Sequence, residues 1–223
     1  MKTSKQQHMQ LFLEQNYRTL TELANDCGIS EAEILNLETA GCIPGHTYET
    51  RQMIIFSCAG INDALTENMD LTTTWYYHNS TELWVKDALP ELKNMSLAEI
   101  ALMVKENFAK QLHNVLGDIK TPGCQNFDQA WGYWIDGTWG KCLKELTVDG
   151  LAKKELSRYH IAQIMEQDPK TVSEDSKIQL TDAVESYIAA SLDFDVYGMR
   201  HLLAEEAIKK FSLNIKIIKQ YHN

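Results

Sequence analysis

Apolar residues recur at helical spacing along most of the chain. From residue 97 to 119 they return every three or four positions, which predicts one long amphipathic helix. The same spacing predicts further helices over about 148–167, 180–191 and 196–211. The pattern is therefore typical of a mainly α protein.

Three S/T-x-x-E sequences mark predicted helix starts, at residues 19–22, 30–33 and 96–99. In such a capping box the hydroxyl accepts a backbone N–H of the first turn, and the Glu accepts the N–H of the capping residue. Gly28 and Gly41 stand where the first two helices should end, because glycine readily adopts the left-handed conformation of a helix C-cap. Two short, adjacent helices with defined ends are expected before residue 42.

Other stretches have the composition or the period of strands. The apolar run 53–56 and the Thr- and aromatic-rich segment 71–77 predict one or two short strands. From residue 211 to 217 apolar and polar residues alternate, which indicates a strand at the end of the chain. The segment from Lys209 onward carries four lysines and no acid, so it could dock on the acidic body or on a partner.

These elements predict a mainly α fold with an amino-terminal helix-turn-helix followed by an irregular helical bundle. We expect residues 1–60 to form the helix-turn-helix-like region and residues 61–223 a mainly helical domain that can pack with it as one unit. Thr-Pro-Gly at 121–123 ends the long predicted helix and marks a candidate boundary.

The segment 17–44 contains Glu-Leu-Ala at 22–24, Gly-Ile-Ser at 28–30 and Gly-Cys-Ile-Pro at 41–44. It resembles the helix-turn-helix of MerR-type regulators, whose pattern runs E-L-A, G-[VI]-S, a second helix and G-[LI]-x-P. That family's second helix supplies Arg and Tyr to DNA. Here the stretch from Asp26 to Glu49 has five acids and no Lys or Arg, so we expect no DNA binding.

Composition and charge narrow the class of protein. The 223 residues are 44% hydrophobic with few Gly and Pro, as in a compact globular protein, and a net charge of −10 opposes unaided binding to phosphates. The five cysteines include no C-x-x-C pair, which favours reduced thiols and a cytoplasmic location. No segment has the ~20 apolar residues of a membrane span, and no apolar core of a signal peptide follows the basic start.

The stretch 127–145 holds three of the five tryptophans. Trp131 and Trp134 share one face of a predicted helix, residues 136–140 predict a tight connection, and a second short helix is expected near Lys141. A cluster of this kind is typical of a core junction, the commoner case, or of an amphipathic binding surface.

Candidate chemistry is sparse. Cys42 and His46, with Cys27 and Cys58 beside them, have the residue types of a zinc site but not its spacing, so no metal is expected. Cys142 and His160 could form a nucleophilic pair. The sequence has no Walker loop, no G-x-G-x-x-G, no H-E-x-x-H and no G-x-S-x-G, and we expect no cofactor.

Two blocks carry a second resemblance. N-Y-x-T-L-x-E-L-A and A-G-C-I-P-G with Tyr48, in residues 16–48, and W-x-x-W-I-D-G-T-W-G-K-C-L with Lys154-Glu155, in residues 131–160, look like an uncharacterised bacterial family loosely labelled natural product biosynthesis proteins. The resemblance implies only an association with such a pathway. Residues of the matching blocks that merit testing are Tyr48, Trp131, Trp134, Asp136, Trp139, Cys142 and Glu155.

The sequence therefore predicts a cytoplasmic accessory protein that binds a small molecule or a partner protein through an aromatic-rich site. The ligand-binding candidates are Tyr48, Trp131, Trp134 and Trp139. The first alternative is an enzyme acting on a natural-product intermediate, with Asp136, Cys142 and Glu155 as candidate catalytic residues. The second is a helix-turn-helix regulator. No membrane partner is expected, and a homo-oligomer is compatible with the sequence.

Overall fold

The structure is a computed structural model that describes residues 4–51, 54–57, 60–64, 73–192 and 202–215. It divides into two compact units. Unit 1 comprises Met1–Lys110 and Phe127–Lys141, and unit 2 comprises Gln111–Asn126 and Cys142–Asn223.

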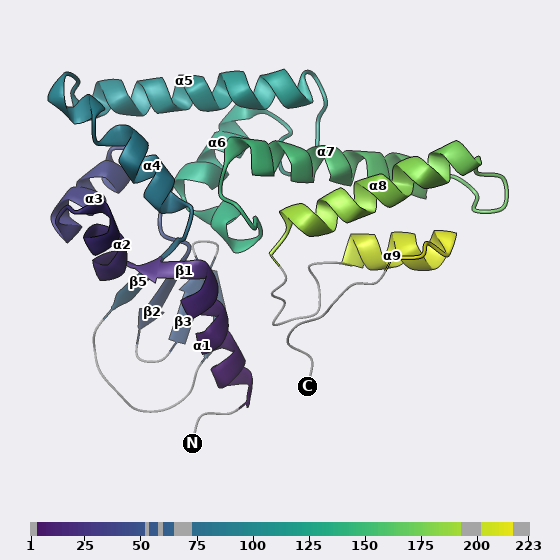
Figure 1. Ribbon diagram of the computed structural model, residues 1–223, viewed down its shortest axis with the longest axis horizontal. Helices are drawn as coiled ribbons and strands as arrows, with labels where there is room; N and C mark the ends of the chain where they lie inside the picture. Colours follow the sequence, from purple (N-terminus) through teal and green to yellow (C-terminus); the bar gives the residue numbers. More distant parts are fainter. Residues whose placement is uncertain (1–3, 52–53, 58–59, 65–72, 193–201, 216–223) are drawn as a thin grey trace. The chain divides into compact units, whose positions relative to one another are not determined.

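Helices account for most of the described residues, as the apolar spacing predicts (Figure 1). The α-helices are α1 (Ser4–Asn16), α2 (Leu20–Cys27), α3 (Glu31–Thr39), α4 (Thr81–Ala88), α5 (Leu97–Leu116), α6 (Phe127–Ile135), α7 (Val148–Met165), α8 (Glu174–Ala190) and α9 (Leu202–Phe211). Two 3-10 helices are η1 (Glu91–Lys93) and η2 (Thr138–Lys141). The predicted mainly α class is confirmed.

A small antiparallel sheet lies in unit 1. Its strands are β1 (Tyr17–Thr19), β2 (Tyr48–Arg51), β3 (Ile54–Ser57), β4 (Gly60–Ala64) and β5 (Thr74–His78), in the order β1-β5-β2-β3-β4. The expected strands are present as β3 and β5, and the sheet has more strands than the one or two predicted. Residues 53, 71 and 72 of the predicted stretches lie outside the described residues.

The register of the sheet separates its two faces. Tyr17 pairs with His78 and Tyr48 with Tyr76, and paired residues share a face. The rings of Tyr17 and Tyr48 meet edge-on at 5.1 Å and both contact Phe12 of α1, so α1 covers this face. On the opposite face, Tyr77 belongs to a core with α2, α3 and α4.

Both predicted amino-terminal helices are present with their capping boxes. The boxes at residues 19–22 and 30–33 form as predicted at the starts of α2 and α3. Gly28 ends α2 at φ +69°, and Gly41 follows α3 at φ +75°, both in the left-handed region that favours glycine. Local sequence is enough to define these ends.

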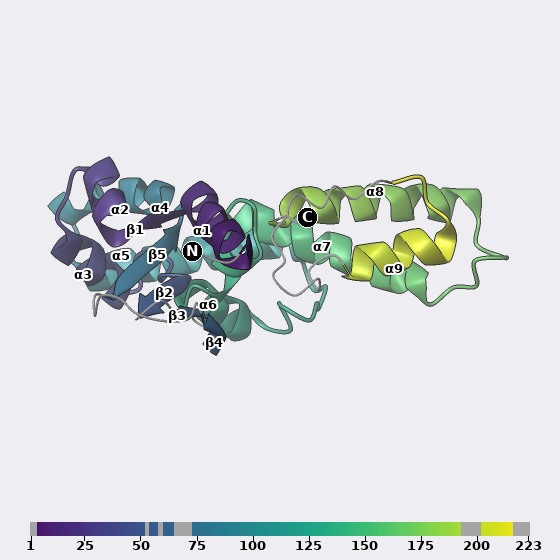
Figure 2. The ribbon, with the colours of Figure 1, turned by 90° about the horizontal axis from the view of Figure 1, so that it is seen from below.

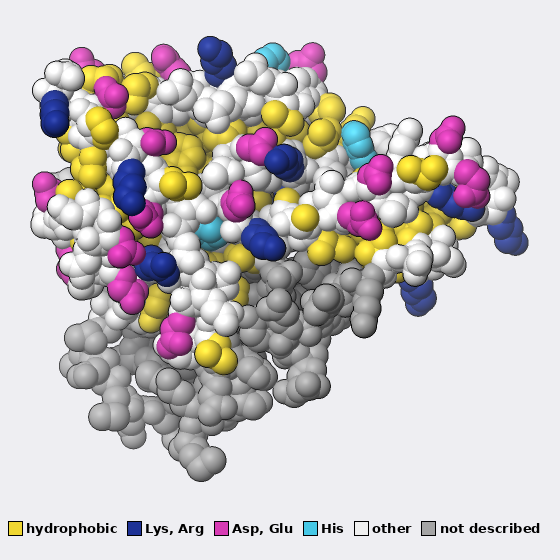
Figure 3. Space-filling model, viewed as in Figure 1, with side chains coloured by type: hydrophobic (Ala, Val, Ile, Leu, Met, Phe, Trp, Pro, Cys, Tyr) yellow, Lys and Arg dark blue, Asp and Glu magenta, His cyan; other side chains and the backbone are white. Residues whose placement is uncertain are grey.

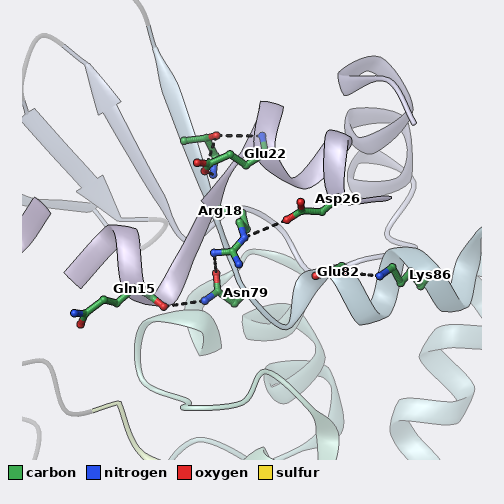
Figure 4. A network of polar contacts seen from close by, with 8 residues as sticks. Gln15, Arg18, Glu22, Asp26, Asn79, Glu82 and Lys86 are labelled. Carbon is green, nitrogen blue, oxygen red and sulfur yellow. Dashed lines mark hydrogen bonds and ion pairs between the residues drawn. The ribbon is translucent and has the colours of Figure 1, made fainter. Parts of the chain in front are cut away.

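Arg18 connects β1 to two neighbouring elements (Figure 4). Its Nε lies 3.2 Å from the Asp26 carboxylate on α2, and its Nη1 donates at 3.1 Å to the Asn79 side chain, which follows β5. Asn79 Nδ2 in turn donates to the carbonyl of Gln15 in α1. This network joins α1, β1, α2 and the end of β5.

In unit 2, α7, α8 and α9 lie side by side in both ribbon views (Figures 1 and 2). They enclose a core that includes Ile161, Val184 and Ala207. A single antiparallel bridge joins Leu143 to Ser191, and Leu192 N donates to the Cys142 carbonyl. The segment before α7 is therefore tied to the end of α8.

Two sequence expectations differ from the structure. The second short helix expected near Lys141 is η2, which begins at Thr138 and ends at Lys141, because the chain already turns as a 3-10 helix in the predicted connection. The last described residues, 212–215, form a turn and irregular backbone instead of a strand, and the rest of the predicted strand lies outside the described residues. Residues 196–201 of the last predicted helix also lie outside them.

The predicted boundary near residue 60 falls within the sheet. β4 begins at Gly60, and β5 pairs with both β1 and β2, so the compact units divide elsewhere. Among the described residues, no helix is both long enough and apolar enough to cross a bilayer.

Candidate functional site

Three of the four predicted ligand-binding residues are part of the core of unit 1. Trp134 is 0% exposed, Tyr48 2% and Trp139 5%. The Trp139 indole N–H donates to the Ala130 carbonyl at 3.1 Å, within its own helix-turn segment. These side chains hold α6 and the sheet in place, as the core-packing interpretation of the tryptophan stretch expects.

Trp131 is only partly buried. Its ring stacks on Phe127 with 14° between the ring planes, and it meets Phe108 of α5 edge-on with centroids 5.3 Å apart. The Lys105 ammonium lies over the Phe127 ring, 5.5 Å from its centroid. The neighbouring Trp134 N–H is buried and has no acceptor among the described residues. Of the three tryptophans in the stretch 127–145, only Trp131 is partly exposed, and it packs on Phe127 and Phe108.

The two sequence blocks that share the natural-product resemblance meet in unit 1. Gly45 N donates to the Ile135 carbonyl at 3.0 Å, and Thr47 Oγ1 donates to the Gly137 carbonyl at 3.3 Å. Tyr17 Oη donates at 2.8 Å to the Gly140 carbonyl. The loop 42–48 before β2 therefore lies against the turn 135–140 that follows α6, and we call this contact the loop junction.

Two glycines allow the backbones at the loop junction to approach. A Cβ on Gly45 would lie 2.5 Å from the Ile135 carbonyl oxygen, well inside van der Waals contact. Gly137 has φ +77°, and a Cβ there would collide with the carbonyl oxygens of Gly45 and His46. Side chains at these positions would force the two segments apart.

A Glu–His pair lies at the edge of the loop junction. Glu38, on the last turn of α3, accepts hydrogen bonds through one oxygen from His46 Nδ1 at 2.8 Å and from His46 N at 3.1 Å. Its other oxygen accepts the Tyr77 hydroxyl of β5 at 2.5 Å. One carboxylate thus joins α3, the loop and the sheet.

Burial and hydrogen bonding shift the pKa of the Glu38 carboxyl in opposite directions. Burial raises the pKa of its carboxyl, but the hydrogen bonds from His46 and Tyr77 stabilise the charged form and bring the pKa below 4.5. Burial, together with the charge of Glu38, raises the pKa of Tyr77. At neutral pH, Glu38 is therefore an ionised carboxylate and Tyr77 a neutral phenol. Because a carboxylate can only accept, His46 Nδ1 must be the donor in the hydrogen bond to Glu38.

The His46 side chain is 31% exposed. One ring face stacks on Trp75 with centroids 5.5 Å apart and 21° between planes, and Tyr77 meets the ring edge-on. Within the described part of the chain, His46 Nε2 has no hydrogen-bond partner.

The candidate catalytic residues do not converge on one center. Asp136 belongs to unit 1, where it is exposed and its carboxylate accepts the Thr138 N–H at 2.8 Å, which fixes the turn. Cys142 and Glu155 belong to unit 2. The Cys142 carbonyl accepts the Lys154 ammonium at 2.8 Å. His160 is exposed and its ring contacts Tyr159, so the hypothetical Cys142–His160 pair is not formed.

Glu155 is fully buried and organises the loop after α5. It accepts the Thr121 hydroxyl and, at 3.1 Å, the Gly123 N–H. Its second oxygen lacks a hydrogen-bond donor among the described residues, and the Arg158 guanidinium lies 3.6 Å away. Burial and the charge of Glu155 raise the pKa of Cys124 to about 12. These contacts make Glu155 an anchor for residues 121–124 and Cys124 an unreactive thiol.

Within the described residues, no group of three or more His, Cys, Asp or Glu side chains could hold a metal ion. Cys58, part of the zinc alternative considered above, lies outside them.

Comparison with known proteins places the carboxyl-terminal part of the chain in a family. Residues 93–215, more than half of the chain, match the profile of a family of unknown function. The chain belongs to the DUF6058 family. The DUF6058 match begins at the end of η1 and includes α5 to α9, with the tryptophan stretch and Glu155, whereas Glu38 and His46 precede it. No curated protein and no solved structure matches the chain.

Sequence reasoning missed the Glu38–His46–Tyr77 site. In the sequence, His46 stands out only as a possible zinc ligand beside Cys42. Glu38 is one of several acids on α3, and Trp75 and Tyr77 have the pattern of core aromatics in a strand. Their meeting depends on the pairing of β5 with β2. The one local signal was the Pro-Gly-His sequence at 44–46, a tight bend directly before a strand.

Proposed function

We propose that this protein is a cytoplasmic accessory protein of a natural-product pathway that binds a small molecule at the loop junction. The observation that carries the proposal is the half-exposed His46, whose ring is stacked on Trp75 and oriented by Glu38. Small-molecule sites typically combine apolar and aromatic surface with a few oriented polar groups. The pathway assignment rests on the sequence resemblance alone.

Preorganisation supports binding over a purely structural role. The imidazole is held on one nitrogen by Glu38, on one face by Trp75 and by a T-shaped contact with Tyr77, so little side-chain entropy remains to be lost when a ligand binds. The residues on either side of His46 contact the turn 135–140, so we place the binding site beside the tryptophan stretch.

Ligand-observed NMR with a library of aromatic and heteroaromatic hydroxyl compounds tests this proposal. We expect wild-type protein to show saturation transfer to a subset of the library, and His46→Ala to lose it while remaining folded, with an unfolding midpoint lowered by the loss of the hydrogen bond to Glu38. Trp75→Phe should retain binding in weakened form, since a smaller ring still stacks.

His113→Ala is the matched control, because His113 is exposed on α5 and is not part of the loop junction. It should bind as wild type does. A library that shows no transfer to the wild-type protein, or transfer that persists in His46→Ala, would contradict the proposed site.

A further inference from the structure

We infer that Tyr77, Glu38 and His46 form a hydrogen-bonded relay in which His46 Nε2 takes a proton from the hydroxyl of a bound planar phenol or enol. This inference rests on the proposed function, because it gives the small molecule at the loop junction a chemical class and gives the site an activity.

The first step in the argument is the tautomer of His46. The carboxylate of Glu38 can only accept, so the hydrogen on Nδ1 is fixed there by the 2.8 Å bond. In neutral imidazole the other nitrogen then carries a lone pair. Nε2 is therefore a hydrogen-bond acceptor and a base, on a side chain that is 31% exposed.

The second step is the stabilisation of the product. When Nε2 gains a proton, the positive charge of the imidazolium lies against the Glu38 carboxylate, which also accepts the His46 N–H and the Tyr77 hydroxyl. These donors keep the carboxylate in place and ionised. Glu38 and Tyr77 are thus positioning residues, and His46 is the group that touches the ligand.

The ligand class follows from the stacked rings and from the lone pair on Nε2. Stacked aromatic rings favour a flat partner, and a lone pair at Nε2 selects a molecule that offers an acidic O–H. In the transfer the ligand O–H bond breaks and the Nε2–H bond forms, which leaves a phenolate or enolate beside the imidazolium. The reverse step returns the proton to the ligand, on oxygen or on the conjugated carbon of an enolate, so no co-reactant is needed.

The side-chain tautomer tests the relay without any ligand. A long-range ¹H–¹⁵N NMR spectrum of wild-type protein at a pH where His46 is neutral should show Nδ1 protonated and Nε2 unprotonated. In Glu38→Gln this preference should weaken, because the amide can present either a donor or an acceptor. A His46 ring protonated on Nε2 in the wild-type protein would overturn the relay.

The second measurement uses 4-nitrophenol, whose phenolate absorbs at longer wavelength than the phenol. Bound to wild-type protein, it should show a phenolate-to-phenol ratio about tenfold above that of the free compound at the same pH, because a cation in contact favours the anion. At saturating 4-nitrophenol, Glu38→Gln should lose most of this excess, and His113→Ala should keep it.

The two possible failures are distinguishable. Binding of 4-nitrophenol at the site without excess phenolate would overturn proton transfer and leave the binding site intact. Absence of binding to the wild-type protein, measured by saturation transfer, would instead overturn the assignment of phenols to this site and count against the proposed function.

Discussion

Glu38 combines structural and chemical roles in one carboxylate. It lies in the last turn of α3, holds the loop before β2 through His46 and accepts the hydroxyl of a strand residue, Tyr77. A partly buried carboxylate with three donors is stabilised in its ionised form, and hydrogen bonds to a charged group contribute about 1.5–3 kcal/mol each. The site therefore also stabilises unit 1.

The pKa shift of Glu38 predicts a dependence of stability on pH. Because the pKa is lowered in the folded protein relative to 4.5, the stabilisation is present above about pH 4.5 and is lost as the pH falls through the lower, folded value. Urea unfolding followed by tryptophan fluorescence should show the free energy of unfolding falling more steeply toward low pH in wild type than in Glu38→Gln. Parallel pH profiles for the two proteins would contradict this role.

At the scale of elements, the loop junction depends on glycine. Gly137 combines a positive φ with backbone oxygen atoms where a Cβ would lie, so Gly137→Ala should destabilise the protein by about 3 kcal/mol or more. Thermal and urea unfolding measure the change.

Gly132→Ala is the control for that substitution. Gly132 lies within α6, and a Cβ there would have nothing within 4 Å, so alanine should be neutral or stabilise by up to about 1 kcal/mol through helix propensity. Equal effects of the two substitutions would show that the close approach at Gly137 does not matter to stability.

Elements defined by local sequence were predictable, and elements defined by distant partners were not. The capping boxes of α2 and α3 involve residues three apart, so their starts are read directly. β1 has only three residues and follows α1 without a break, and its partner strand β5 lies about 60 residues further along the chain. No alternation of apolar and polar residues in the local sequence therefore predicts β1.

In the candidate site too, local sequence predicts the helix but not the contacts with distant parts of the chain. Trp131 and Trp134 were placed correctly on a helix, but whether each is buried depends on α5 and α4, to which Phe108 and Trp84 belong. His46 attracted notice only as a metal ligand, because its partners Glu38, Trp75 and Tyr77 come together through the sheet. Periodicity predicts which face of an element is apolar, but not which polar side chains meet across a sheet.

At the scale of the whole molecule, charge argues against the regulator alternative. The net charge is −10, and the exposed residues of α3 include Glu31 and Glu33. On the face drawn in Figure 3, acidic and basic side chains are interspersed over the described residues. A helix of this sign at the DNA-reading position would repel phosphates.

Fluorescence anisotropy with a labelled duplex from the protein's own promoter tests this expectation. We expect no sequence-selective binding at physiological salt. A variant with Ala32→Lys and Asn36→Lys, both exposed on α3, should gain weak, salt-sensitive affinity and so show that charge is the obstacle. Selective, salt-dependent binding by the wild-type protein would make the helix-turn-helix regulator the better interpretation.

The loop junction also sets an order of events during synthesis. Thr47 and the Gly137 carbonyl that it contacts are 90 residues apart in the chain. At about 5–20 residues per second, a ribosome needs roughly 5–20 s to make the intervening segment. During that interval the emerging loop 42–48 lacks the acceptors that the turn 135–140 provides, so its donors must be satisfied by water or by a chaperone. The amino-terminal sheet, whose last strand ends at His78, can form early, but the loop junction is completed only when the tryptophan stretch leaves the exit tunnel.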